Sequence, residues 1–276
     1  MSDGPREFPF TRYPARQGFA WLATAYRMFK VYRLAWVVLV LAYFVVLVLM
    51  QSVPFIGPYA AALLSPVFGV GLLAAAWTQE RGGRPAFSQL FQGFRTNLWS
   101  LVAIGVFFVA AIALVAFASS LVDGGKLREL MANSKEMTEA QIAAALSDPQ
   151  LQLGVAFSAL LSLAVMIATW WTQALVVFQD AGPGAALKAS LRAALANWKP
   201  LAFYGVGIFF YIGVVPGLIT AIVAVVVPLP AAQLLVIALL LPYSLFFAAT
   251  LYVSFYVSYR DVFHAGETLT PLSSGS

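Results

Sequence analysis

The sequence has no cysteine and a single histidine, His264. The absence of cysteine excludes disulfides, thiolate metal sites and cysteine nucleophiles. His264 follows the last apolar segment, in a polar tail, so a histidine-rich metal or haem site is excluded as well. We therefore expect no metal and no cofactor.

Charged residues are also scarce. They make up 10% of the 276 residues, whereas hydrophobic residues make up 62%, and the mean hydropathy is +0.87. Soluble domains average about 25% charged and about 45–50% apolar residues, so this composition excludes a water-soluble fold. The apolar runs are about 20 residues long, the length at which a helix crosses a hydrocarbon core of roughly 30 Å. The chain is therefore predicted to be an all-α integral membrane protein.

Six membrane spans are expected, at about 34–51, 55–77, 99–121, 152–178, 200–227 and 231–258. The first follows a long, charged, amphipathic segment, which favours a retained span over a cleavable signal peptide. Basic residues dominate the N-terminal segment and the loops after the second and fourth spans, whereas acids outnumber them in the loop at about 122–150. By the positive-inside rule, both termini are cytoplasmic and this loop lies outside.

The loop at about 122–150 is the one sizeable segment expected on the outer side. Thr138 followed by Gln141 predicts a capping box that starts a short helix through about Leu146. Two roles are open for this loop. It is either a solvated connector or a docking site for an external partner.

A short amphipathic stretch occurs three times, each time directly before an apolar hairpin. Its apolar positions recur at steps of four, three and four residues, which places the side chains on one face of an α-helix. They are Trp21, Ala25, Met28 and Tyr32, then Phe87, Phe91, Phe94 and Leu98, and finally Leu187, Leu191, Ala194 and Trp198.

Each of these units begins and ends on the same side of the membrane. We therefore predict three parallel repeats, each an interfacial helix followed by a transmembrane hairpin, arranged in a pseudo-threefold bundle. The repeats cover about 15–80, 84–180 and 184–263 of a single membrane domain over 15–263, flanked by an N-terminal tail at 1–14 and a flexible tail at 264–276.

Basic residues border the apolar stripes of the three amphipathic stretches. Such a helix can lie in the headgroup plane and attract anionic lipid. The same pattern suits a helix that packs on the bundle, so both environments are open. The candidate interfacial or partner-binding residues are Arg16, Trp21, Arg27, Phe87, Phe91, Phe94, Lys188, Arg192 and Trp198.

No Asp, Glu, Lys, Arg or His lies deep in any expected span. Proton- and ion-coupled proteins carry such residues although each costs about 2.5–3.5 kcal/mol at the bilayer centre, so a pump or antiporter is not expected. No acid, base and nucleophile are placed together either, so the protein is not expected to be an enzyme. The net charge of +5 comes from residues that flank apolar segments, so no nucleic-acid partner is expected.

The fourth span carries a mild polar cluster toward its cytoplasmic half. Its members are Thr169, Trp170, Trp171, Thr172 and Gln173. Polar side chains in a span either hydrogen-bond neighbouring helices or line a ligand site. Both roles are open for this cluster.

The fifth span contains Gly213, Pro216 and Gly217. Glycines spaced four apart allow close helix packing. The proline removes a helix hydrogen bond, so it can also kink or break the span and expose backbone carbonyls to a substrate.

The stretch from Ala156 to Gly205 includes WWTQALVVFQDAGPGAALKASLRAALANWKPLAFYG. It resembles a family of uncharacterised inner-membrane proteins, found mainly in betaproteobacteria, with six spans and an aromatic-rich fourth helix. The start, Ala15-Arg16-Gln17-Gly18, is similar too, and the resemblance covers about Pro14 to Phe263. The residues that match the family's helical turn are Ala186, Leu187, Ser190, Ala193, Asn197 and Trp198.

This resemblance implies a multi-pass protein of the bacterial inner membrane. More distantly, the repeat resembles the membrane domain attached to some glycerophosphodiester phosphodiesterases. Neither resemblance supplies an activity, because the family has no assigned function and this chain has no phosphodiesterase domain.

Two functions fit these features. The first is a non-enzymatic protein that binds membrane lipid or a membrane-protein partner, as an accessory subunit of a membrane complex. The second is a passive or facilitated transporter of a small apolar or amphipathic molecule, using the glycine- and proline-rich spans. We expect the first. A solid bundle with no cavity at membrane depth would argue against the second.

Overall fold

The computed structural model describes residues 8–134, 136–228 and 231–264, and no strand occurs among them. Six helical segments are long and apolar enough to cross a membrane, so the six-span all-α prediction is confirmed. The last of them extends further than expected, to Phe263. The six segments are Arg33–Gln51 (α2), Gly57–Glu80 (α3), Leu98–Asp123 (α4), Pro149–Gln179 (α7 and α8), Trp198–Val226 (α10, η2 and α11) and Ala231–Phe263 (α12).

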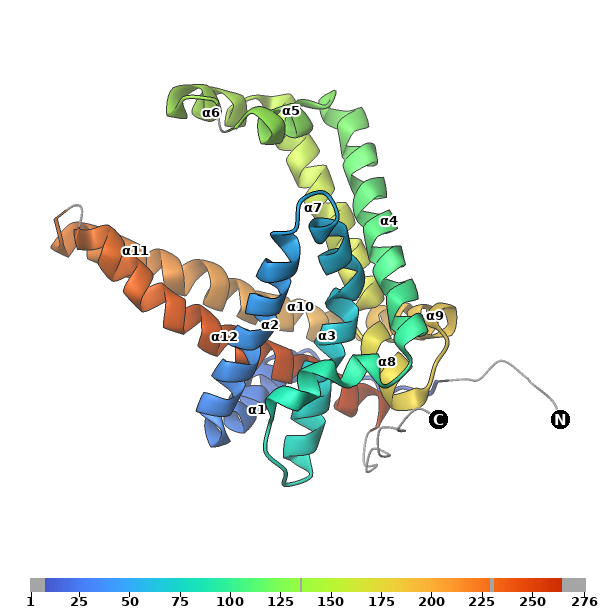
Figure 1. The fold of residues 1–276 in the computed structure, drawn as a ribbon. Helices are drawn as coiled ribbons and strands as arrows, with labels where there is room; N and C mark the ends of the chain where they lie inside the picture. Colours follow the sequence, from blue (N-terminus) through green and yellow to red (C-terminus); the bar gives the residue numbers. More distant parts are fainter. Residues whose placement is uncertain (1–7, 135, 229–230, 265–276) are drawn as a thin grey trace.

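The spans pair into three hairpins that share one base. The hairpins are α2 with α3, α4 with α7 (Pro149–Thr169), and α10 (Trp198–Phe209) and α11 (Val215–Val226) with α12. Figure 1 shows them diverging from the base, with α5 (Lys126–Asn133) and α6 (Glu139–Leu146) at the far end of α4 and α7. We call that far end the distal end. Helix α6 begins at Thr138, whose hydroxyl accepts a hydrogen bond from the Gln141 backbone N–H, so the predicted capping box is confirmed.

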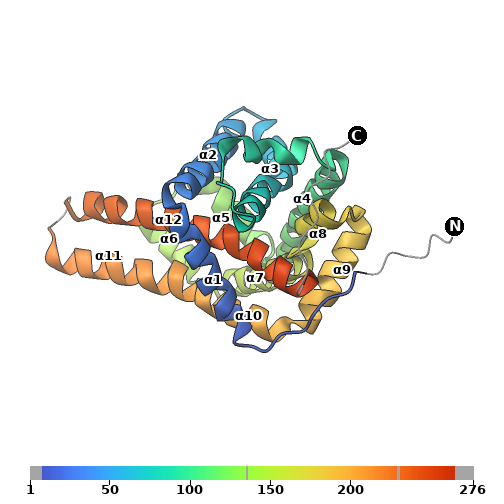
Figure 2. The same cartoon turned by 90° about the horizontal axis from the view of Figure 1, so that it is seen from below.

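The base contains the short elements between the hairpins. They are α1 (Gln17–Val31), the 3-10 helix η1 (Phe87–Phe94), α8 (Thr172–Gln179) and α9 (Pro183–Ala196). Viewed from below, α12 runs through the middle of the base and α1 crosses it (Figure 2). The chain is therefore packed most densely at this end.

Buried aromatic side chains with polar tips hold the base together. A buried polar group is costly unless it is hydrogen-bonded, and several of these rings reach a partner on another element. The indole of Trp36 donates to the Gln79 side chain at 2.6 Å. The hydroxyls of Tyr204 and Ser254 lie 2.5 Å apart. These bonds fix how α2, α3, α10 and α12 meet.

A charged cluster joins the end of α12 to α3 and α1. Arg260 pairs with Glu80 and, at 2.7 Å, with Asp261. The Asp261 carboxylate also accepts hydrogen bonds from Gln17 at 2.9 Å and from the indole of Trp21 at 3.1 Å. These charges lie at the ends of their helices, as do the other Asp, Glu, Lys and Arg residues of the described spans.

The segment before α1 is bound across the base. The Thr11 N–H donates to the Val262 carbonyl at 2.7 Å, and the Tyr13 N–H donates to the Asn197 side chain at 2.9 Å. The Asn197 amide in turn donates to the Thr11 carbonyl at 3.1 Å. Part of the segment expected as a tail at 1–14 is thus tied to α12 and to the α9–α10 corner, and residues 265–276 lie outside the described part.

The three amphipathic stretches differ in helix type and in the face they bury. In α1 half of the predicted stripe is buried, with Trp21 and Ala25 at 0% exposure, whereas Met28 and Tyr32 are partly buried. The expected second α-helix is instead the 3-10 helix η1, with Leu90 and Gly93 buried. A 3-10 helix has three residues per turn, so Leu90 and Gly93 share the buried face, whereas Phe91 and Phe94 share another face and are 37% and 38% exposed.

Close backbone contact with α3 accompanies this tighter winding. A Cβ on Gly93 would lie 2.1 Å from the Val67 carbonyl oxygen of α3.

In α9 the buried face consists of alanines and Ser190, whereas Leu191 and Trp198 are exposed. A threefold relation between the units stays a prediction.

Candidate functional site: an intramembrane cavity

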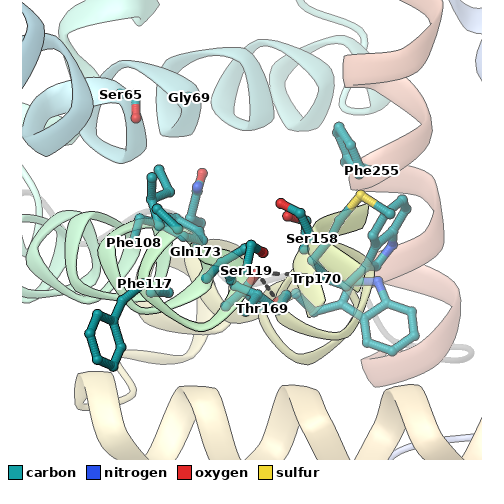
Figure 3. A pocket seen from close by; sticks show the side chains of 18 of the residues that line it. Ser65, Gly69, Phe108, Phe117, Ser119, Ser158, Thr169, Trp170, Gln173 and Phe255 are labelled. Atoms are coloured by element: carbon teal, nitrogen blue, oxygen red, sulfur yellow. Dashed lines mark hydrogen bonds between the residues drawn. The ribbon is translucent and has the colours of Figure 1, made fainter. Parts of the chain in front are cut away.

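A cavity of about 1120 Å³ lies between the hairpins. It is larger than a typical small-molecule pocket, which holds about 300–1,000 Å³. Its walls come mainly from α3, α4, α7 and α12, with smaller contributions from α2 and α8, and α5 closes its distal end. In Figure 3, Ser65 and Gly69 of α3 face Ser119 and Thr169 across the cavity. Because these wall helices belong to the spans, the cavity lies at membrane depth.

Apolar side chains form most of the lining, and a series of hydroxyls interrupts it. A hydroxyl in an apolar helix usually bonds a carbonyl of the preceding turn. Ser120 does so with Phe117 at 2.7 Å, and Thr169 does so with Val165 at 2.8 Å. Ser119 differs. Its side chain is 2% exposed, and its hydroxyl has no partner among the described residues.

Two consecutive tryptophans at the base end of the cavity have different roles. The Trp171 indole donates to the Ser258 hydroxyl at 3.1 Å, and the Trp171 backbone N–H donates to Ser190 at 3.0 Å. The Trp170 ring packs edge-on against Phe255, 4.8 Å between centroids, and its buried N–H has no partner in the described part of the chain. Trp171 therefore joins helices, whereas Trp170 presents an unused donor at the cavity.

The other members of the predicted polar cluster also differ, in whether they line the cavity. Gln173 lines the cavity, where its side-chain oxygen lies 3.0 Å from the position of a Cβ on Gly69. Thr172 is 1% exposed and does not line the cavity. The structure thus places Thr169, Trp170, Trp171 and Gln173 at one site and leaves Thr172 outside it.

The turn from α4 into α5 fixes the distal end. Gly124 and Gly125 adopt positive φ angles of 66° and 86°, which glycine tolerates without steric cost. The buried Asp123 carboxylate accepts the backbone N–H of Gly125 at 2.7 Å and of Leu127 at 3.1 Å. This holds α5 over the cavity, where Leu127, Arg128 and Met131 line it.

An ion pair ties α5 to the start of α7. Lys126 lies 2.5 Å from Asp148, which also accepts the N–H of Gln150 at 2.8 Å as the N-cap of α7. The hydrogen bond from Lys126, followed by that from the Gln150 N–H, lowers the pKa of Asp148 below its ordinary value. Helix α5, within the expected outer loop, therefore packs against the spans and forms part of the cavity wall. Whether the loop is a connector or a docking site stays a prediction.

One side of the cavity is not covered by protein. Ile112 and Phe117 of α4 are 65% and 62% exposed although they line the cavity, and Met166 of α7 is 48% exposed. No described segment packs over these three side chains. The cavity is therefore open on this side of the spans.

The fifth span does not contribute to the cavity lining. Its helix continues past Pro216 through a π-helical turn, Phe210–Val214 (η2), instead of breaking. A Cβ on Gly217 would meet nothing within 4 Å, and one on Gly213 would meet only the Phe209 ring. The glycines are thus not at a helix contact within the described residues.

The predicted interfacial residues lie at the base, away from the cavity. Trp21 is buried between α1 and its neighbours. The three phenylalanines of η1 are partly exposed and contact one another and Phe68 of α3. The residues that point outward are Arg16, Arg27, Phe87, Phe91, Phe94, Lys188, Arg192 and Trp198.

Several lining residues were not predicted from the sequence. On α7 a signal was present, since Ser158, Ser162 and Thr169 recur at steps of four and seven and therefore share one helix face. Ser119 and Arg128 gave no such signal. Their place depends on the α4–α5 turn, which brings two consecutive helices to one end of the cavity.

The chain is similar to a probable inner membrane protein of Burkholderia thailandensis. The two are 28% identical over 262 residues, which cover 93% of this chain and 94% of that protein. No family model matches the chain, and no solved structure does. Together with the six apolar helices, this similarity supports a multi-pass inner-membrane protein. The distant likeness to phosphodiesterase membrane domains finds no support in these comparisons.

Proposed function

We propose that this protein is a non-enzymatic inner-membrane protein that binds a membrane lipid between its hairpins. The cavity of about 1120 Å³ carries this proposal. It is mainly apolar, lies at membrane depth and is uncovered on the side of Ile112, Phe117 and Met166. A lipid chain that enters from the bilayer would fill it.

Polar groups must select the lipid. Lipid tails are as apolar as leucine, so moving a chain from bilayer to cavity gains little hydrophobic free energy. Hydrogen bonds to otherwise unsatisfied groups are worth about 1–3 kcal/mol each. The free hydroxyl of Ser119 and the free N–H of Trp170 are such groups, at opposite ends of the cavity.

The base offers a second contact with lipid. Phe87 and Trp198 are exposed there, 53% and 59%, with basic residues beside them. Under the orientation predicted by loop charge, this face meets the cytoplasmic leaflet, where each Lys or Arg near the surface contributes about 1 kcal/mol with anionic lipid. A membrane-protein partner would dock on the same exposed rings.

The binding of lipid is tested by comparing two bulky substitutions on neighbouring positions of α7. Ser162 lines the cavity, whereas the adjacent Leu163 is 46% exposed and does not. We expect lipid to co-purify with the wild-type protein in mild detergent at a fixed stoichiometry, measured by native mass spectrometry. Ser162→Trp should lose it and Leu163→Trp should keep it. Equal lipid content in all three proteins contradicts the proposal.

A second candidate, a facilitated transporter of an amphipathic molecule, is favoured by the length of the same cavity. Its lining runs from Arg128 at the distal end to Gln173 near the base. The route would follow the cavity and not Gly213 to Gly217. Proteoliposomes with a fluorescent phospholipid separate the two functions. Faster exchange between leaflets supports a transporter, and unchanged exchange with stable binding supports a binding protein.

A further inference from the structure

We propose that the distal end of the cavity binds the phosphate of a phospholipid through Arg128, and that Ser119 donates to the ester carbonyl of the same lipid. This inference rests on the proposed lipid-binding function and names the class of lipid. Three observations carry it: an unpaired guanidinium, an unpaired buried hydroxyl and the spacing between them along the cavity.

The guanidinium of Arg128 is available for an anion. Arg128 lines the cavity from α5, and none of the described acidic residues forms an ion pair with it. The two nearby acids on the adjoining helices have other partners, since Asp123 accepts two backbone N–H groups and Asp148 binds Lys126. Glu129 follows Arg128 directly, and successive residues on a helix do not face each other. The planar guanidinium fork fits a phosphate group.

The hydroxyl of Ser119 is available for a neutral acceptor. It is nine-tenths buried or more, faces the cavity and lacks the carbonyl partner that Ser120 has. A ligand oxygen would satisfy it without any change in the protein. An ester carbonyl is such an acceptor, and each chain of a glycerophospholipid has one directly below the glycerol.

The order of the two groups matches the order of groups in a phospholipid. Ser119 lies one helical turn before Asp123, where α4 ends, which is about 6 Å deeper at 1.5 Å per residue. Arg128 lies beyond that end, on α5. A phosphate at Arg128 therefore leaves the ester at the depth of Ser119, and the chain continues past Ile112 and Met166 toward Phe255. A neutral lipid would use Ser119 and leave Arg128 unused.

The test compares two lipids with identical chains on the delipidated full-length protein. The probes are phosphatidylglycerol and the matching diacylglycerol, with Kd measured by titration in detergent micelles. A hydrogen bond to a charged group is worth about 1.5–3 kcal/mol, so we expect wild type to bind phosphatidylglycerol at least about tenfold more tightly. Arg128→Gln should remove this preference and leave diacylglycerol binding unchanged. Arg12→Gln, an equal loss of charge on the segment before α1, should keep the preference.

Ser119→Ala completes the design. It should weaken the binding of both lipids by a similar factor, several-fold in Kd, because both have the ester. The thermal stability of the lipid-free protein should not be lowered. A preference that survives in Arg128→Gln overturns the phosphate site. If glycerol 3-phosphate alone displaces the bound phosphatidylglycerol, the assignment of the ligand as a lipid is overturned. If wild type binds neither lipid, the proposed function itself fails, whereas equal binding of both lipids overturns this inference alone.

Discussion

The hydroxyl of Tyr243 donates a hydrogen bond to the backbone carbonyl of Tyr211, 2.6 Å away. This bond completes the π-helical turn η2. In that turn the Val215 N–H bonds the carbonyl five residues back, at Phe210. The next bond of the series would join Pro216 to Tyr211, but proline has no N–H. A side chain of α12 therefore satisfies the carbonyl that the proline leaves without a donor, as membrane helices require.

A double-mutant cycle tests this relationship. Tyr243→Phe should destabilise the protein by about 1 kcal/mol, because it leaves the Tyr211 carbonyl unpaired in an apolar surrounding. In the Pro216→Ala background a backbone N–H is available, so the same substitution should have a smaller effect. Denaturation in mixed micelles measures both. Additive effects would show that the tyrosine and the proline act independently.

Glycine substitutions at two positions should differ sharply in their effect on stability. A Cβ on Gly93 would overlap the Val67 carbonyl, whereas one on Gly217 would meet nothing within 4 Å. We expect Gly93→Ala to destabilise the base by about 3 kcal/mol, since backbone at both sides must move. Gly217→Ala should be neutral or stabilising by up to about 1 kcal/mol, because alanine is the better helix former. Thermal unfolding followed by circular dichroism compares them.

The hydrogen bond between Trp171 and Ser258 should contribute measurably to the base. Trp171→Phe keeps a ring but loses the indole donor, so we expect a loss of about 1–2 kcal/mol in the free energy of unfolding. The matched control is Trp99→Phe, because Trp99 is 81% exposed. A loss of equal size in both variants would mean that the hydrogen bond contributes nothing specific.

Acid should loosen α5 from α7. The pKa of Asp148 is lowered in the folded protein, so its pairing with Lys126 stabilises the fold above the unfolded pKa of about 3.9 and is lost as pH falls through the folded value. Amide exchange in α5, corrected for intrinsic rates, should therefore speed up below about pH 4. Asp148→Asn keeps an N-cap side chain and should make the exchange insensitive to pH in this range.

The sequence predicted the spans well and the packing of the base poorly. Length and apolarity alone define a span, so the ends of α2 and α4 lie close to the expected ones. Phe87, Phe91 and Phe94 follow α-helical spacing, yet their helix is of the 3-10 type and its Gly93 lies against the α3 backbone. A periodic pattern shows that one face is apolar. It does not show which neighbour covers that face.

The same limit applies to the cavity. Thr169 and Gln173 were identified because polar residues stand out in an apolar span. Ser119 did not stand out, since a serine in such a helix usually bonds its own backbone. Its unpaired hydroxyl depends on the spatial arrangement of α3, α4, α7 and α12, which single-chain periodicity does not contain.

The binding of the N-terminal segment across the base has a consequence for biosynthesis. Thr11 donates to Val262, and the main partners of α1 are α10 and α12. A chain is made from its N-terminus, so α1 leaves the ribosome long before its partners exist. It must wait at the membrane surface until the sixth span has been inserted. The first helix to be translated is thus among the last to dock, and release of the finished chain allows the base to close.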